Sequence, residues 1–135
     1  MNIKIAIVDD NTFLIHAIKE KLSFFEELKF KFSATNGSEL LQQLEDNFHI
    51  DLILMDIEMP VMDGVDATRA IRASVNETGS SPYIVATTAN AMQGDRERYL
   101  SAGMNGYISK PIRISELVGA LETAYQSSVT TTVST

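Results

Sequence analysis

The sequence predicts an α/β fold in which a parallel, doubly wound sheet carries helices on both faces. Five short apolar segments alternate with five segments of helical periodicity along the 135 residues, and this alternation is typical of parallel strands joined by crossover helices. The first apolar segment is β-branched and apolar on nearly every side chain, as expected of a strand that is covered on both faces. Charged residues directly follow three of the segments, which predicts a functional edge of the sheet.

The first half of the chain contains two predicted strands and two predicted helices. Residues 3–8 form an apolar run that predicts a buried strand, and polar side chains at 10–12 then offer a cap for a helix ending near Leu22. Apolar and polar residues alternate at 28–34, where two lysines indicate an edge strand that resists pairing with another chain. A turn at Asn36-Gly37 precedes a second helix with apolar residues on one side.

The second half repeats the same alternation. Gly103 is expected to end the helix that precedes it. Residues 127–135 are uncharged and consist of Ser, Thr and Val, so we expect one domain over residues 1–126 and then a flexible tail or the start of a linker. The predicted elements are, in order, a strand at 51–55, a helix at 65–74, a polar loop at 76–82, a strand at 83–86 ending at Thr87-Thr88, a helix at 91–102, a strand at 106–109 and a final helix capped by Ser115.

Composition excludes several classes of protein. No apolar run approaches the ~20 residues needed to span a bilayer, and the charged residues after the first run argue against a secretory signal. The chain has no cysteine, which excludes disulfides, thiol catalysis and cysteine-ligated zinc. The net charge is −7 and no basic face is evident, so we expect no direct contact with nucleic acid. These features favour a cytoplasmic protein without a membrane segment.

Four charged residues follow the ends of predicted strands. Asp9 and Asp10 come after the first strand, Asp56 after the third and Lys110 after the fifth. Because the carboxyl ends of parallel strands meet at one edge of the sheet, we expect these side chains to share one pocket. Clustered carboxylates repel one another unless a cation joins them, and oxygen ligands of this kind suit Mg²⁺.

The motifs around these residues resemble those of the receiver domain of two-component response regulators. The resemblance extends from residue 3 to about residue 126 and implies a flavodoxin-like (βα)5 fold with the sheet order 2-1-3-4-5. It also implies a cis peptide bond before Pro111 and a phosphoacceptor aspartate, which here is Asp56. The motifs that carry the resemblance are Val8-Asp9-Asp10-Asn11, Met55-Asp56-Ile57-Glu58-Met59-Pro60, Met62-Asp63-Gly64, Thr88-Ala89 and Lys110-Pro111.

The resemblance assigns a role to each residue of the expected pocket. Asp56 is the nucleophile, and Mg²⁺ is bound by Asp56, directly by Asp10, and through water or more weakly by Asp9. Lys110 neutralises one phosphoryl oxygen, and the Thr88 hydroxyl forms a hydrogen bond with another. Glu58 contributes its backbone carbonyl to the metal. Three further features are implied: Ala89 leaves room for the phosphoryl donor, Thr88 responds first to the phosphoryl group, and Tyr107 is the aromatic switch residue.

The function implied by the resemblance is that of a signalling switch in a phosphorelay. A histidine kinase or a histidine phosphotransfer protein donates the phosphoryl group, and the output domain or target is unknown. The surface expected to change is formed by the helix at 91–102, the strand at 106–109 and the final helix, which also leaves room for a phosphorylation-dependent dimer. Such a domain catalyses its own phosphorylation and slow dephosphorylation but turns over no external substrate.

Two other functions remain open from the sequence. One is a Mg²⁺-dependent phosphohydrolase with an aspartyl nucleophile. In haloacid-dehalogenase-like phosphatases that nucleophile follows the first strand, with a second aspartate two residues on, whereas Asp9 and Asp10 are adjacent here. The other is an interaction module that works without phosphate, although the acidic pair, the acceptor and the lysine are all present.

Overall fold

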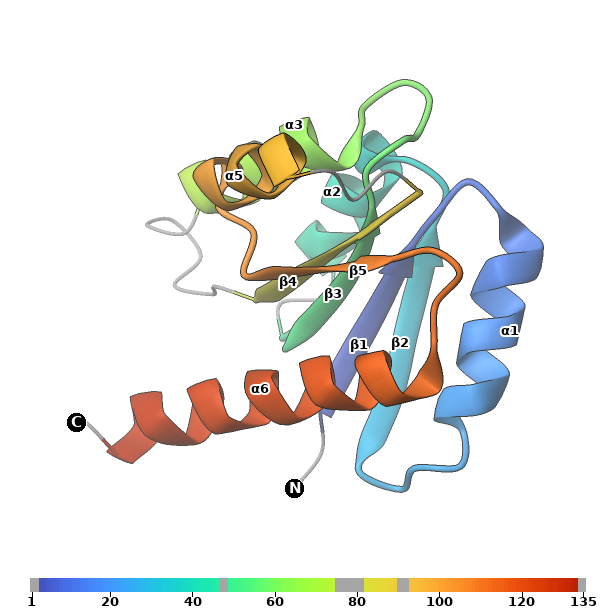
Figure 1. Cartoon of the computed structure of the whole chain (residues 1–135), viewed down its shortest axis with the longest axis vertical. Helices are drawn as coiled ribbons and strands as arrows, with labels where there is room; N and C mark the ends of the chain where they lie inside the picture. The colour runs from blue at the N-terminus through green and yellow to red at the C-terminus, as the bar shows by residue number, and fades with distance from the viewer. Residues whose placement is uncertain (1–2, 47–48, 75–81, 90–92, 134–135) are drawn as a thin grey trace.

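The five strands form one parallel sheet in the order β2-β1-β3-β4-β5 (Figure 1). This order and the parallel pairing confirm the fold class that the sequence predicts. The computed structural model describes residues 3–46, 49–74, 82–89 and 93–133. The strands are β1 (Ile3–Val8), β2 (Leu28–Ala34), β3 (Leu52–Asp56), β4 (Tyr83–Thr88) and β5 (Gly106–Ser109).

Helices cover both faces of the sheet. Figure 1 shows α1 and α6 against one face, and α2, α3 and α5 against the other. The helices are α1 (Thr12–Leu22), α2 (Gly37–Asp46), α3 (Gly64–Ala73), α5 (Gln93–Ala102) and α6 (Ile114–Val133). Among the described residues, no helix is both long enough and apolar enough to cross a bilayer.

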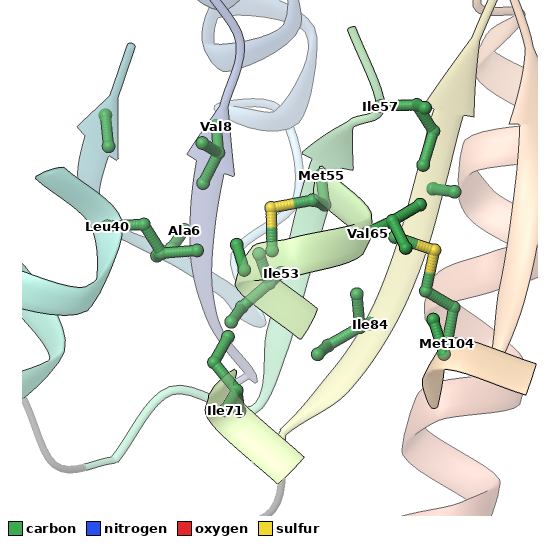
Figure 2. Close-up of a cluster of buried hydrophobic side chains, with 14 of the residues drawn as sticks. Ala6, Val8, Leu40, Ile53, Met55, Ile57, Val65, Ile71, Ile84 and Met104 are labelled. Atoms are coloured by element: carbon green, nitrogen blue, oxygen red, sulfur yellow. The ribbon is translucent and has the colours of Figure 1, made fainter. Parts of the chain in front are cut away.

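Alternating side chains of the central strands supply two separate hydrophobic cores. In β3, for example, Ile53 and Met55 pack beneath α2, α3 and α5, whereas Leu52 and Leu54 pack beneath α1 and α6. Figure 2 shows the first of these cores, in which strand residues meet Leu40 and other helix residues. Because both faces are covered, all of β3 is buried, which explains its continuous apolar sequence.

Strand β2 lies at the edge of the sheet, as its alternating sequence predicts. Lys29 and Lys31 are exposed, while Phe32 points into a core. The pairing of β1 with β2 shifts register between Ile5 and Ala6, so that Lys31 has no partner in β1. A bulge of this kind twists an edge strand and, together with the lysines, discourages pairing with another sheet.

Helix boundaries differ from the sequence predictions in two places. The final helix begins at Ile114, and the Leu117 N–H donates to the Arg113 carbonyl, so Ser115 lies inside the first turn and is not the cap. That helix also continues to Val133, where the sequence predicts a flexible tail or the start of a linker from residue 127. No proline follows Pro111 to interrupt it. The division of the chain at residue 126 stays a prediction.

Two predicted features lie outside the described residues. They are most of the polar loop at 76–82 and the start of the helix at 91–102. The predicted cis peptide bond is confirmed, since the bond between Lys110 and Pro111 is cis.

The carboxyl end of α5 is fixed by a glycine and an arginine. Gly103 has φ 110°, and the Met104 N–H donates to the Tyr99 carbonyl at 3.1 Å, which is the expected helix-ending motif. The Arg72 guanidinium donates to the carbonyls of Gly103 and Pro82 and to Asn105 Oδ1, each at 2.8 Å. One side chain on α3 therefore ties the end of α5 to the start of β4.

Gly64 allows the amino end of α3 to lie directly against the end of β3. A Cβ atom at this position would overlap the Asp56 carbonyl oxygen and lie 2.9 Å from Cγ of Met55. The Gly64 N–H also donates to the Ile57 carbonyl at 3.1 Å. The loop after β3 can follow its observed path only because this position lacks a side chain.

We expect Gly64→Ala to lower the free energy of unfolding by about 1 to 3 kcal/mol, because the added methyl group must displace the backbone at Asp56. Urea unfolding followed by circular dichroism measures the change. Gly119→Ala is the matched control, since a Cβ there meets no atom within 4 Å. The control is expected to stabilise α6 by about 0.5 to 1 kcal/mol. Equal effects of the two substitutions would contradict the steric argument.

Candidate phosphoryl-accepting site

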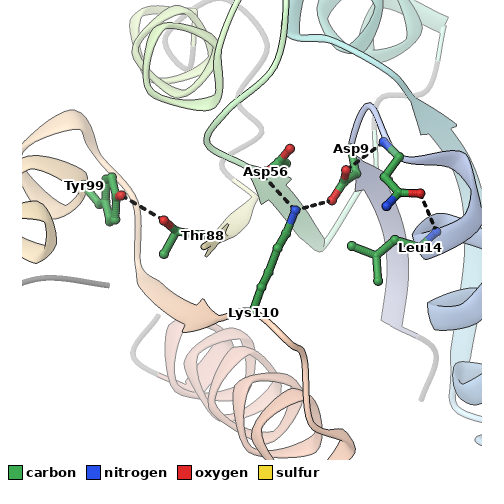
Figure 3. A network of polar contacts seen from close by, with 7 residues as sticks. Asp9, Leu14, Asp56, Thr88, Tyr99 and Lys110 are labelled. Atoms are coloured by element: carbon green, nitrogen blue, oxygen red, sulfur yellow. Dashed lines mark hydrogen bonds and ion pairs between the residues drawn. The ribbon is translucent and has the colours of Figure 1, made fainter. Parts of the chain in front are cut away.

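Three strand ends bring an ammonium group into contact with two carboxylates. The Lys110 Nζ atom lies 3.0 Å from Asp9 Oδ2 and 3.2 Å from Asp56 Oδ1. Figure 3 shows the lysine extending between the two aspartates from the segment after β5. Residues separated by 101 and 54 positions in the chain therefore meet at the carboxyl edge of the sheet.

Backbone hydrogen bonds fix Asp9 and Lys110 beside the end of β3. The Asp9 N–H donates to the Ala34 carbonyl at 3.0 Å, and Asp9 Oδ1 accepts from the Asn11 N–H at 2.9 Å. The Lys110 N–H donates to the Thr88 carbonyl at 2.7 Å. The Asn11 side chain, as the sequence predicts for this segment, caps α1 by accepting from the Leu14 N–H at 3.1 Å. The charged groups are thus held by regular secondary structure.

The Asp56 carboxyl group is almost completely covered, with the residue 3% exposed. Burial raises its pKa from the ordinary 3.8 to about 6, and the negative charge of Asp9 adds to the effect. The charge and hydrogen bond of Lys110, together with a backbone hydrogen bond from Glu58, act in the opposite direction. The single ammonium group therefore does not neutralise the site completely.

Lys110 remains an ammonium group in this environment. Burial alone would lower its pKa, but the hydrogen bond and charge of Asp9, followed by those of Asp56, outweigh that effect and raise the pKa above the ordinary value. The site therefore keeps a fixed positive charge beside its candidate nucleophile.

The aspartates also have the arrangement that a divalent cation requires. Asp9, Asp10 and Asp56 each offer a carboxylate oxygen, and these oxygens lie within 4.8 Å of one another. Asp10 is exposed, whereas the other two are buried. Oxygen ligands with excess negative charge suit a hard cation such as Mg²⁺, so the residues present fit the metal that the sequence predicts.

The other predicted site residues lie around this cluster. The Glu58 residue is exposed on the loop after β3, and Ala89 is exposed at the end of β4. Thr88 is 1% exposed, and Tyr107, on the edge strand β5, is 38% exposed. In this structure the tyrosine in contact with Thr88 is Tyr99, which the sequence reasoning did not identify.

Tyr99 connects Thr88 to helix α5. Its hydroxyl lies 3.3 Å from Thr88 Oγ1, and the residue is only 3% exposed (Figure 3). It also lines a cavity of about 430 Å³ between α5 and the loop after β3. The only sequence signal for this residue is an aromatic side chain within a predicted, mostly polar helix, and this signal does not indicate its partner.

The chain matches a protein-family model over most of its length. A model described as the response regulator receiver domain matches residues 5–122. The chain is also similar to Hybrid signal transduction histidine kinase K of Dictyostelium discoideum, with 36% identity over 130 residues that cover 92% of this chain. Its identity to Two-component response regulator 24 of Arabidopsis thaliana is 35% over 117 residues, or 86% of this chain.

The relatives differ greatly in length. The chain spans 10% of hybrid kinase K and 7% of Hybrid signal transduction histidine kinase I of the same organism, but 80% of Two-component response regulator 24. The similarity to the two kinases therefore concerns a small part of each.

Solved structures have the same fold. One is the co-crystal structure of the Saccharomyces cerevisiae histidine phosphotransfer signaling protein Ypd1 and the receiver domain of its downstream response regulator Ssk1. The TM-score to the matching chain is 0.78, with 29% identity, and the match covers 87% of this chain and 84% of that one. The receiver domain of Francisella response regulator 1452 has a TM-score of 0.80 at 24% identity, covering 94% of this chain and 99% of that one.

We expect Asp56→Asn to increase the free energy of unfolding at pH 7 without metal. Because the folded pKa is raised from 3.8 to about 6, this carboxyl group reduces stability as the pH rises through that interval. Allowing for screening by solvent, its replacement should add about 1 to 2 kcal/mol at pH 7 and almost nothing below pH ~4. Lys110 keeps Asp9 as a partner in the variant.

Urea unfolding in EDTA, followed by circular dichroism at both pH values, measures this difference. Glu122→Gln removes one negative charge from an exposed position on α6 and controls for the change in net charge. A loss of stability in Asp56→Asn at pH 7 would contradict the argument.

Proposed function

The chain belongs to the response regulator receiver family, and from this premise we propose that it accepts a phosphoryl group on Asp56 and then changes the surface formed by α5, β5 and α6. The observation that carries the proposal is the contact of Lys110 with both Asp9 and Asp56, at 3.0 and 3.2 Å. This contact places a nucleophile, a second carboxylate and a fixed positive charge at one strand edge.

The chemistry assigned to this chain is transfer of a phosphoryl group from a phosphohistidine. An oxygen of the Asp56 carboxylate attacks phosphorus, the phosphorus–nitrogen bond of the donor breaks, and an acyl phosphate forms. The Lys110 ammonium neutralises one phosphoryl oxygen, and the Thr88 hydroxyl donates to another. Asp10 and Ala89 are exposed, and the proposal has the donor reach the covered carboxylate past these two residues.

The proposed metal ligands are the carboxylates of Asp9, Asp10 and Asp56 and the backbone carbonyl of Glu58. Asp10 and Asp56 bind directly, and Asp9 binds through water or more weakly. The fit is supported by three carboxylates whose oxygens lie within 4.8 Å of one another, of which only Asp9 and Asp56 contact the Lys110 ammonium. When bound, Mg²⁺ supplies charge neutralisation for the phosphoryl oxygens.

The proposed donors are histidine kinases or histidine phosphotransfer proteins. Similarity to a hybrid histidine kinase and to the receiver in the Ypd1–Ssk1 structure supports this class of partner. The proposal includes slow hydrolysis of the acyl phosphate by the domain itself, a cytoplasmic location, and phosphorylation-dependent dimerisation through α5 and α6. It includes no external substrate and no direct contact with nucleic acid.

We expect incubation with acetyl phosphate and Mg²⁺ to add the mass of one phosphoryl group to the intact protein. Asp56→Asn should remove the adduct, because an amide oxygen is a poor nucleophile and carries no charge. EDTA should prevent its formation in the wild type. Intact-mass spectrometry measures both effects.

The same experiment separates the alternatives. Glu58→Gln controls for the loss of one carboxylate, since only the backbone of this residue is assigned a role, and it should retain the adduct. If the wild-type protein acquires no adduct, the domain is an interaction module that works without phosphate. Rapid turnover of acetyl phosphate without a persistent adduct, together with turnover of a generic phosphomonoester, would identify a phosphohydrolase.

We expect Tyr107→Ala to leave phosphorylation of Asp56 intact but to weaken the response of the α5-β5-α6 surface. Tyr107 is 38% exposed on the edge strand β5, and the proposal has its ring move inward when Thr88 shifts. Amide hydrogen exchange with and without acetyl phosphate measures the response. An identical change of exchange in wild type and variant would exclude the proposed role of this ring.

A further inference from the structure

A buried hydroxyl pair lies beside the phosphoryl-accepting site. The Tyr99 O–H donates to Thr88 Oγ1 at 3.3 Å, and the two residues are 3% and 1% exposed. In Figure 3 this contact points away from Asp56 and Lys110, which lie on the other side of Thr88. The Thr88 hydroxyl is therefore directed toward helix α5 in the unphosphorylated domain.

The two orientations of Thr88 exclude each other. A threonine side chain occupies discrete staggered rotamers, and a change of rotamer carries Oγ1 to a different side of the strand. When the Thr88 hydroxyl turns toward a phosphoryl oxygen on Asp56, it therefore loses its hydrogen bond with the Tyr99 hydroxyl. Because Tyr99 is only 3% exposed, its O–H then loses the Thr88 partner in a mostly covered position, which costs free energy.

We infer that Tyr99 is a positioning residue that holds Thr88 in the resting orientation and transmits its departure to α5. The inference rests on the proposed function, because it assumes that Thr88 binds the phosphoryl group. Binding of that group must break the contact between Thr88 and Tyr99, so the strength of this contact sets part of the balance between the two states.

The surroundings of Tyr99 allow the helix to respond. Tyr99 lines a cavity of about 430 Å³. Ile57 and Met59, from the loop after β3, line the same cavity. This cavity is the feature beside Tyr99 that the proposal uses as space for a changed ring position. The route therefore runs from Asp56 through Thr88 and Tyr99 to α5, and it is separate from the route through Tyr107.

The inference predicts that Tyr99→Phe binds a phosphoryl analogue more tightly than the wild type. Phenylalanine keeps the ring in place but removes the hydroxyl that competes for Thr88. With fluoroberyllate and saturating Mg²⁺, we expect about fivefold tighter binding by calorimetry, the size expected for one neutral hydrogen bond. Tyr83→Phe removes a hydroxyl at the start of β4 and should leave the affinity unchanged.

A double-variant cycle tests whether Tyr99 acts through Thr88. In the Thr88→Ala background, Tyr99→Phe should produce no further gain in affinity, because the contact is already absent. A structural role of Tyr99 alone would lower the melting temperature without tightening fluoroberyllate binding, and that outcome would overturn the inference. Equal gains in both backgrounds would also overturn it.

A spectroscopic measurement on the unsubstituted sequence covers the case in which a variant folds poorly. The chain has four tyrosines, so 3-fluorotyrosine labelling gives four ¹⁹F resonances, of which Tyr99→Phe removes one and assigns it. We expect that resonance to shift when fluoroberyllate and Mg²⁺ bind. An unchanged Tyr99 resonance in a domain that binds the analogue would overturn the inference.

Failure of the proposed function gives a different result. A wild type that binds no fluoroberyllate, or an Asp56→Asn variant that binds it equally well, would refute the site itself. Wild-type binding that depends on Asp56, with an unaltered or weaker affinity in Tyr99→Phe, would refute only the role of Tyr99.

Discussion

The repulsion between two buried carboxylates is the constraint on which this site depends. Asp9 and Asp56 are 2% and 3% exposed, and they are held together by rigid strands. Lys110, contributed by a segment near the other end of the chain, contacts both and reduces the repulsion. The pKa of Asp56 is nevertheless raised to about 6, first because the carboxyl group is buried and second because of the negative charge of Asp9. The folded chain thus bears an electrostatic cost that a cation bound to these carboxylates would relieve.

This constraint also explains why the site is connected to a distant surface. Charge added to Asp56 acts first on its immediate neighbours, and Thr88 is joined to Lys110 through the bond from the Lys110 N–H to the Thr88 carbonyl at 2.7 Å. Strand β4 is buried between two cores. Residues at its carboxyl end therefore cannot move without displacing the helices that pack on them. Helix α5 is one of these helices, and its contact with Thr88 through Tyr99 is the link to the strand edge that we infer above.

The sequence predicts the parallel sheet and the pocket well because both follow from local patterns, whereas the order of the strands was implied only by the resemblance to receiver domains. Apolar runs with adjacent charged residues identify β1, β3 and β5, and the order of parallel strands places their ends together. The contact between Tyr99 and Thr88 is not predictable in this way, since it depends on the rotation of a polar helix about its own axis. The start of α6 at Ile114 is also not predicted correctly. Serine is a common capping residue, but Ser115 lies inside the first turn of the helix and not at the capping position.

Arg72 has a consequence for any displacement of α5. Its three hydrogen bonds attach the Gly103 carbonyl, at the carboxyl end of that helix, to α3 and to the segment before β4. A helix that is held at one end can tilt only about that end. The amino end of α5 lies farthest from this attachment, so any tilt about Gly103 would displace residues 93–95 more than the residues beside the glycine. The position of the Arg72 guanidinium group therefore determines which end of the helix would move in such a tilt.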